Sequence, residues 1–290
     1  MKVFFWNIGE DDKTLTCTVF KNKLKIIKAV INQESPDIFC IIEGTKSELH
    51  NKLLIRLFKQ EEYSAYYHPL MPKSDKYKGY FDFDNFFSQG LKIFYKKALG
   101  KSIIPLSPSI SLYHGRLIKL IVANNIFIFL HRNRSADKNA QDQFISQIKQ
   151  WIIYEPDNAE KNFYVLGDFN LTPWDSNYFD ENTGYLESSI IEEVHNIRMR
   201  EGLSLSFYNP IIQVLNSKSE TNLGGTYYKN DKKYRWQILD YVLFQKYDAK
   251  TMIMDIITKI GTYDLINKNE KSKSFINYNF DHLPIKIELK

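Results

Sequence analysis

Short apolar runs, each meeting a polar residue at one end, constrain the fold of this chain more than any other feature of its sequence. The runs are rich in β-branched and aromatic residues, and runs this short predict buried β-strands. They are Val3–Ile8, Ile38–Ile42, Ile126–Leu130 and Phe163–Leu166, and Ile285–Leu289 adds a final strand in which apolar and charged residues alternate. Because strand ends are rigid supports for functional groups, the polar residues there become candidates for a common site.

Helical patterns fall between these runs. We expect helices over Leu24–Ile31, stopped by Pro36, and over Ser47–Tyr63, with Leu49 on the apolar face beside the other leucines. Further helices are expected over Ala140–Ile153 and Ser188–Arg200.

Additional strands are expected over Gln89–Tyr95, Thr226–Tyr228 and Gln237–Phe244, with a hairpin turn at Asn124-Asn125 before the Ile126–Leu130 run. Strands outnumber helices, and no linker-like change in composition divides the chain. We therefore expect one domain over residues 1–290, in the α/β class, with sheet packed against sheet and helices outside.

Composition and charge limit which substrates and cellular locations can be expected. The net charge of +5 is mild, so it permits an anionic substrate without identifying one. Two cysteines, Cys17 and Cys40, do not make a disulfide scaffold, and no apolar stretch approaches the length of a membrane helix. The expectation is a cytoplasmic protein with no membrane association, and the sequence indicates no protein partner.

The polar residues at the strand ends make a chemically consistent set. They are Asn7, Glu43, His131, Asp168, Asp281 and His282, together with Asp240, which interrupts the strand expected over Gln237–Phe244. Carboxylate and amide oxygens are the ligands that Mg²⁺ or Mn²⁺ prefers, and a magnesium site usually takes only one or two protein carboxylates. Because there is no His/Cys cluster at zinc spacing, the histidines suit proton transfer and phosphate contact better than zinc binding.

Several of these residues lie in segments that resemble motifs of the endonuclease/exonuclease/phosphatase (DNase I-like) superfamily. The matching segments occur in the family's order, from the opening strand that ends at Asn7 to the last strand: Pro36–Glu43, Gly167-Asp168-Phe169-Asn170, Leu239-Asp240-Tyr241 and Asp281–Ile285. The resemblance runs over nearly the whole chain and is closest to poorly characterised bacterial members. It implies a four-layer fold, a two-sheet β-sandwich flanked by helices on both outer faces.

The resemblance also implies roles at the site. Glu43 would bind Mg²⁺ (Mn²⁺ could substitute), with Asn7 adjacent and Asp281 as a further metal residue. Asp168 would position or polarise the nucleophile. Asn170 would hydrogen-bond the transition state.

The remaining implied roles concern the two histidines. His282 would act as general base or contact the scissile phosphate, and Asp240 would orient it. His131 falls where some family members use a second histidine.

Three further residues are weaker candidates for contact with substrate. Arg116 falls where the family places an arginine, and Arg134 either meets a phosphate or is solvated. Trp174 either stacks on a base or packs against the turn that follows Asp168.

The sequence departs from the family pattern in places that affect the choice of substrate. Abasic-site endonucleases tend to carry an acidic residue where this chain has Gly9, and Gln237–Asp240 replaces the Cys-Asp-Arg run of inositol-polyphosphate phosphatases. Both of these branches are therefore less favoured. The basic charge of the chain and the expected intracellular location favour nucleic acid, so a nuclease acting on nucleic acid, DNA first, is the leading hypothesis. The alternatives are a phosphatase or phosphodiesterase acting on a small or lipid phosphate, and a non-catalytic binding module.

Overall fold

The computed structural model describes most of the chain that carries these motifs. The described residues are 1–9, 17–44, 47–66, 91–104, 117–132, 148, 161–170, 172–173, 186–188, 206–218, 223, 225–228, 236–244, 252–266, 276, 278 and 280–290. The candidate residues Arg116, Arg134 and Trp174 lie outside them. So do the segment expected as a helix over Ala140–Ile153, apart from a buried, helical Ile148, and residues 189–200 of the other.

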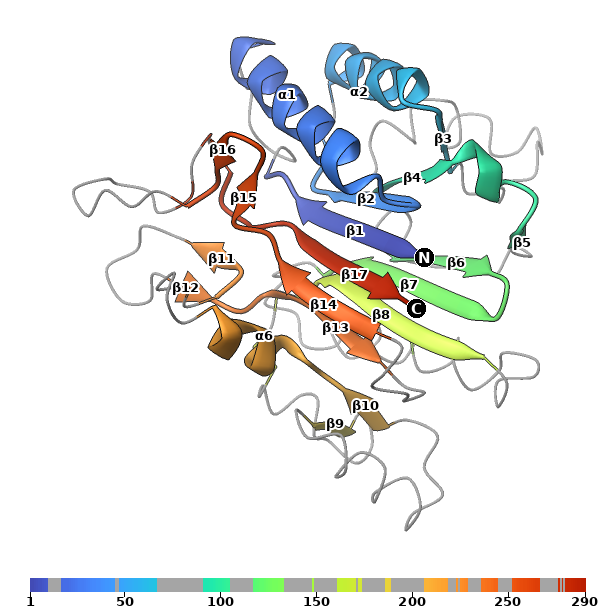
Figure 1. Cartoon of the computed structure of the whole chain (residues 1–290), viewed down its shortest axis with the longest axis vertical. Helices are drawn as coiled ribbons and strands as arrows, with labels where there is room; N and C mark the ends of the chain where they lie inside the picture. The colour runs from blue at the N-terminus through green and yellow to red at the C-terminus, as the bar shows by residue number, and fades with distance from the viewer. Residues whose placement is uncertain are drawn as a thin grey trace, which may run out of the picture.

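The first β-sheet has six strands in the order β14-β17-β1-β2-β4-β3. Their bounds are Lys2–Asn7 for β1, Ile38–Ile42 for β2, Tyr63–Ala65 for β3, Lys92–Lys96 for β4, Met252–Ile256 for β14 and Ile285–Leu289 for β17. The central pair, β1 and β2, runs parallel, and β17 pairs antiparallel with β1 on its other side. This pairing brings the two ends of the chain together, so that the Met1 ammonium group donates to the Leu289 carbonyl (Figure 1).

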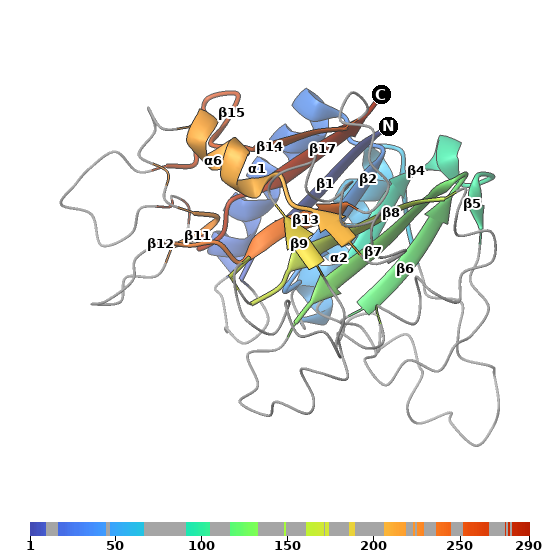
Figure 2. The same cartoon turned by 90° about the horizontal axis from the view of Figure 1, so that it is seen from below.

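The second β-sheet has seven strands in the order β5-β6-β7-β8-β13-β10-β9. Their bounds are Ile103–Ile104 for β5, Leu117–Val122 for β6, Asn125–His131 for β7, Asn162–Asp168 for β8, Leu186–Ser188 for β9, Ser206–Tyr208 for β10 and Asp240–Phe244 for β13. Seen from below, the two sheets form separate layers, with β17, β1 and β2 in the upper layer of the view and β6, β7 and β8 in the lower one (Figure 2). The side chains between them belong to one hydrophobic core.

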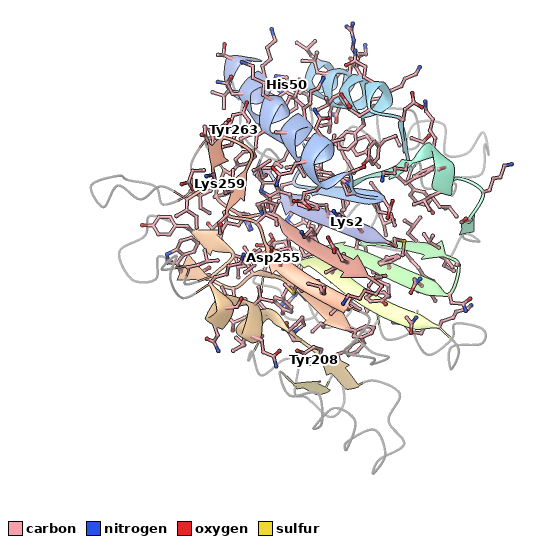
Figure 3. The ribbon with its side chains drawn as sticks, viewed as in Figure 1. Lys2, His50, Tyr208, Asp255, Lys259 and Tyr263 are labelled. Atoms are coloured by element: carbon pink, nitrogen blue, oxygen red, sulfur yellow. The ribbon has the colours of Figure 1, made fainter. Side chains whose placement is uncertain are left out.

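Helices α1 (Cys17–Glu34) and α2 (Glu48–Gln60) lie together on the outer side of the six-stranded sheet (Figure 1). The Phe58 ring of α2 stacks on Phe94 of β4 at 3.8 Å between centroids and meets Phe39 of β2 edge-on. Such aromatic contacts fix a helix on a sheet because they bury large apolar areas in a defined geometry. His50 lies between the two helices (Figure 3), where its ring stacks on Phe20 of α1.

The remaining elements of the described residues are short. They are the 3₁₀ turn η2 (Lys97–Leu99), helix α6 (Ile211–Ser217), the pair β11 (Tyr227–Tyr228) and β12 (Trp236–Gln237), and the pair β15 (Lys259–Ile260) and β16 (Tyr263–Asp264). Helix α6 packs against β14, and Lys218 next to it forms an ion pair with Asp255 at 2.8 Å. Asp255 and Tyr208 are labelled in Figure 3, with Tyr208 at the far edge of the molecule from His50. In the described part of the chain, no helix has the length and apolar character needed to cross a bilayer.

Several boundaries differ from the sequence expectation. The expected helix over Leu24–Ile31 is longer in the structure and ends at Glu34, where Ser35 takes a φ of 45° before Pro36. Leu49 is 57% exposed instead of buried, because the inward positions of the first turn of α2 go to His50 and Asn51.

One turn and one strand also differ from the sequence expectation. The hairpin turn is Ala123-Asn124, since Val122 pairs with Asn125 and Ala123 takes the left-handed φ of 52°. The run Gln237–Phe244, expected as one strand, is divided between β12 and β13, which belong to different sheets.

Candidate active site

Three polar residues lie side by side where three neighbouring strands of the seven-stranded sheet begin or end. His131 pairs in register with Asp168, and Asp168 pairs in register with Asp240, across the adjacent strands β7, β8 and β13 (Figure 1). Paired residues of neighbouring strands point to the same face of a sheet. All three side chains are buried, so the fold gathers a histidine and two carboxylates where water is scarce.

Asn7 connects these strand ends to the six-stranded sheet. Its Nδ2 atom donates to Oδ2 of Asp168 at 2.9 Å, and its Oδ1 atom accepts from the Gly9 amide at 2.9 Å. A backbone N–H can only donate, so the bond from Gly9 fixes which end of the Asn7 amide carries the oxygen. The nitrogen of Asn7 therefore faces the carboxylates, and the oxygen faces Gly9.

Glu43 follows β2 and lies beside Asn7, which pairs with Ile42. Its Oε1 atom is 3.0 Å from Nε2 of His131. Burial pushes the pKa of Glu43 upward, but the hydrogen bond and charge of His131, the charge of His282 and a hydrogen bond from Asn7 outweigh it and lower the pKa to about 2. Glu43 is thus a permanent carboxylate at neutral pH.

His282 is paired with Asp240. The Nδ1 atom lies 2.6 Å from Oδ2 of Asp240, and both side chains are buried. Burial alone would lower the pKa of His282, but the charge and hydrogen bond of Asp240, followed by the charges of Asp281 and Asp168, raise it to about 10. Because a carboxylate only accepts, Nδ1 carries the shared proton and Nε2 is the ring atom left for a substrate.

Asp168 lies at the centre of the cluster. Burial and the charge of Asp240 raise its pKa, the charges of His282 and His131 act against them, Glu43 adds a further rise, and the pKa is about 6. Its Oδ1 atom accepts from the Asn170 amide at 2.9 Å, and its Oδ2 atom accepts from Asn7. Both oxygens are therefore held in fixed directions.

The end of β8 and the turn that follows it have a backbone geometry that depends on particular residues. Gly167 has a φ of 144°, and a Cβ there would lie 2.0 Å from the Leu130 carbonyl oxygen, so only glycine fits. Asn170 has a φ of 50°, and its Nδ2 atom donates to the Arg132 carbonyl at 2.5 Å. Glu43 also has a φ of 50°. Left-handed backbone at non-glycine residues is uncommon and concentrates at functional sites.

The donor set fits a hard divalent cation. Single ligand atoms of Glu43, His131 and Asp168 lie within 4.8 Å of one another, and so do those of Asp168, Asp240 and His282. The Oδ1 atom of Asp281 is buried and has no hydrogen-bond partner among the described residues. Its carboxylate also lies against Gly9, where a Cβ would come within 2.7 Å of Oδ1. A buried oxygen without a donor is a favourable position for a metal ion.

The structure brings together all of the described candidates: Asn7, Glu43, His131, Asp168, Asn170, Asp240, Asp281 and His282. Sequence reasoning missed two buried polar residues beside them. Arg132 directly follows the candidate residue His131, and this position is the signal that could have identified it. Its carbonyl accepts a hydrogen bond from Nδ2 of Asn170. Thr226 carries no signal in the sequence, because its contacts are all with residues distant along the chain.

Comparisons with known proteins agree with this geometry. The model of the Endonuclease/Exonuclease/phosphatase family matches residues 5–251. A comparison with curated proteins finds no match.

Three solved structures share the fold at low sequence identity. An AP endonuclease from Archaeoglobus fulgidus has a TM-score of 0.56 at 16% identity, over 100% of this chain and 99% of its own. TDP2 from D. rerio, complexed with single strand DNA product, has a TM-score of 0.56 at 15% identity, over 99% and 97%. The 3' phosphatase NExo from Neisseria, bound to a product DNA hairpin, has a TM-score of 0.54 at 15% identity, over 100% and 99%.

The structural likenesses confirm the expected α/β sandwich of two sheets. The family match covers most of the sequence and includes Asn7, Glu43, His131, Asp168 and Asp240. The chain belongs to the Endonuclease/Exonuclease/phosphatase family, and its reaction class is the hydrolysis of phosphate esters.

Proposed function

We propose that this protein is a Mg²⁺-dependent nuclease that hydrolyses phosphodiester bonds in nucleic acid, with DNA as the first candidate. One observation carries the proposal most directly. Asp168 lies between two groups, the Glu43–His131 pair and the Asp240–His282 pair, and its carboxylate is within 4.8 Å of ligand atoms in both. A phosphodiester placed over Asp168 would meet metal ligands on one side and a positively charged imidazole on the other.

The proposed metal residues are Glu43 and Asp281. Glu43 is ionised at all ordinary pH values, and Asp281 has a buried oxygen that lacks a donor among the described residues. Bound Mg²⁺ would supply charge neutralisation at the phosphate and the leaving oxygen. Asn7 would act beside the metal by fixing Asp168 and Glu43, since its nitrogen faces both carboxylates.

The proposed catalytic residues are Asp168 and His282, supported by Asp240, Asn170 and His131. Asp168 is ionised above pH 6 and held by two donors, which suits it to orient a water molecule and accept its proton. With a pKa near 10, His282 is protonated at neutral pH, which favours contact with a phosphate oxygen through Nε2 over the role of general base.

The choice of nucleic acid as the substrate rests on the charge of the chain and on the DNA bound in similar solved structures. The chain carries a net charge of +5 even though its site gathers several carboxylates, a combination that suits a polyanion held beside a cation. Two of the similar structures, TDP2 and NExo, were solved with DNA products. A small or lipid phosphate is the alternative substrate that the assay must separate.

The test is a substrate panel with purified protein and Mg²⁺ or Mn²⁺. The panel contains supercoiled plasmid, single-stranded DNA, RNA, phosphoinositides and sphingomyelin, each with and without EDTA. Glu43→Gln and His282→Ala should each abolish cleavage. Glu62→Gln makes the same carboxylate-to-amide change as Glu43→Gln at a side chain that is 78% exposed, and it should cleave like the wild type.

Two outcomes would contradict the proposal. Turnover of lipid phosphate without cleavage of any nucleic acid would exclude the nuclease. Cleavage that persists both in EDTA and in His282→Ala would exclude the proposed mechanism.

A further inference from the structure

Thr226 is a completely buried residue whose hydroxyl group contacts the start of β13. Its Oγ1 atom accepts hydrogen bonds from the backbone N–H groups of Leu239, at 3.1 Å, and Asp240, at 3.0 Å. A hydroxyl oxygen has two lone pairs, so both are used on consecutive amides of one turn. The contact sets the position of the backbone from which the Asp240 side chain projects.

The main chain at Thr226 contacts the segment that carries His282. The Thr226 carbonyl accepts from the Leu283 amide at 2.8 Å, and the Asp281 carbonyl accepts from the Tyr228 amide at 2.8 Å. Tyr227 forms a β-bridge with His282, and the two rings lie 4.5 Å apart between centroids. The residue on each side of His282 is therefore hydrogen-bonded to the segment 226–228.

The segment approaches β12 closely as well. The Thr226 amide donates to the Gln237 carbonyl at 3.0 Å. A Cβ on Gly225 would lie 2.4 Å from that same carbonyl oxygen, so glycine is required for the approach. The segment 225–228 thus lies between the two chain segments that supply the catalytic pair, and it is bonded to both.

We propose that Thr226 is a positioning residue for the Asp240–His282 pair, a role that rests on the proposed phosphodiesterase function of that pair. The 2.6 Å bond between Nδ1 and Oδ2 requires two segments 42 residues apart to be aligned closely. The Thr226 hydroxyl fixes the Asp240 side of the bond, and the Thr226 carbonyl fixes the His282 side. Loss of the hydroxyl leaves the buried amides of Leu239 and Asp240 without this acceptor, and the start of β13, which bears Asp240, moves away from His282.

The experiment compares variants that separate the hydroxyl from the methyl group. Thr226→Ser keeps the hydroxyl, Thr226→Ala removes both groups, and Thr226→Val keeps the shape without the hydroxyl. Two readouts are used: kcat and KM on the nucleic acid that the wild type cleaves, and the proton NMR signal of the His282 Nδ1–H in metal-free protein. The second readout needs no substrate.

The expected result is a kcat reduced about 100-fold in Thr226→Val and Thr226→Ala with KM nearly unchanged, because a catalytic group displaced by about 1 Å costs a factor of this order. The downfield Nδ1–H signal should move or broaden in the same variants, and Thr226→Ser should restore both readouts. If Thr226→Val does not fold, the pair Thr226→Ser and Thr226→Ala makes the same comparison.

Three results would overturn the proposal: wild-type kcat in Thr226→Val, equal losses in Thr226→Ser and Thr226→Ala, or an unchanged NMR signal in variants that have lost activity. If the wild type cleaves no phosphodiester, the proposed function fails. The NMR comparison then decides separately whether Thr226 aligns the pair.

Discussion

Asp240 and His282 are 42 residues apart in sequence, yet Oδ2 of one and Nδ1 of the other are separated by only 2.6 Å in the interior of the protein. The two residues come from chain segments that belong to different sheets. Asp240 begins a strand of the seven-stranded sheet, and His282 precedes the last strand of the six-stranded sheet. The bond therefore joins the two layers of the sandwich at the site, as the Asn7–Asp168 bond does a short distance away.

Asp240→Asn should lower kcat by about 10³–10⁴-fold with little change in KM, because an amide in place of the carboxylate no longer holds His282 in the required tautomer and charge state. The double variant Asp240→Asn/His282→Ala should be no worse than His282→Ala alone, since the two residues act as a unit. Steady-state kinetics on the cleaved nucleic acid measures both. Asp255→Asn, at a surface ion pair with Lys218, is the matched control and should retain full activity. Additive losses in the double variant would contradict the pairing.

Asn7→Asp tests which end of the Asn7 amide faces the carboxylates. The Nδ2 atom donates to Asp168, so an aspartate would place a second negative oxygen 2.9 Å from Oδ2 of Asp168 and remove a hydrogen bond. We expect activity to fall about 10–100-fold, the range found when residues that orient a metal site are changed. Mg²⁺ affinity measured by calorimetry should not increase. Tighter Mg²⁺ binding with retained activity would show instead that the position acts as a direct metal ligand.

Gly9→Ala should weaken both the fold and the metal site. Gly9 has a φ of 64°, and the new Cβ would lie 2.7 Å from Oδ1 of Asp281. The backbone cost is about 1 kcal/mol, and displacement of the Asp281 carboxylate should lower Mg²⁺ affinity in addition.

Gly261→Ala is the matched control for this variant. Gly261 has a φ of 55°, but a Cβ there would make only an ordinary contact with Gln33. It should show the same loss in denaturant unfolding without the loss of Mg²⁺ affinity. Equal metal affinity in the two alanine variants would argue against Asp281 as a metal residue.

The pH dependence of stability in metal-free protein follows from His282 and Asp168. The pKa of His282 is about 10 in the folded protein against an ordinary 6.5, so its proton stabilises the fold fully below pH 6.5, and this contribution is lost as the pH rises through 10. The pKa of Asp168 is about 6 against 3.8, so its contribution is complete below 3.8 and is lost as the pH rises through 6. Glu43, with a pKa of about 2 against 4.5, loses its contribution only as the pH falls from 4.5 through 2.

In EDTA, the Tm of the wild type should therefore fall as the pH rises from about 6.5 toward 10, and the fall should be smaller in Asp240→Asn, which lacks the main charge that holds the His282 proton. Differential scanning calorimetry of both proteins across this range measures the difference, which cancels the titration of surface groups. Parallel Tm curves for the two proteins would contradict the assignment.

The sequence by itself determined the elements with strong local patterns. The strands over Ile38–Ile42 and Ile285–Leu289 have the predicted bounds. The first is a continuous apolar run that is buried along its whole length, and the second alternates apolar and charged residues, with Ile285 and Ile287 buried. It also indicated which carboxylates, amides and histidines would lie together, since polar residues at strand ends can be identified without coordinates. The order of the motifs predicted the family, which the family match confirmed.

Only the tertiary structure decided how these residues act on one another. Gln237–Phe244 is divided into two strands of different sheets, and the amides of Leu239 and Asp240 at the division donate to the hydroxyl of Thr226. The exposed Leu49 likewise reflects which face of α2 meets α1, a packing choice that helical periodicity leaves open.

The orientation of Asn7, the raised pKa of Asp168 and the pairing of His282 with Asp240 all arise from contacts between residues far apart in the chain. Local sequence encodes which residues are buried and where strands end. The electrostatics of a buried site depend on distances across two sheets, and those distances exist only once the sheets have packed.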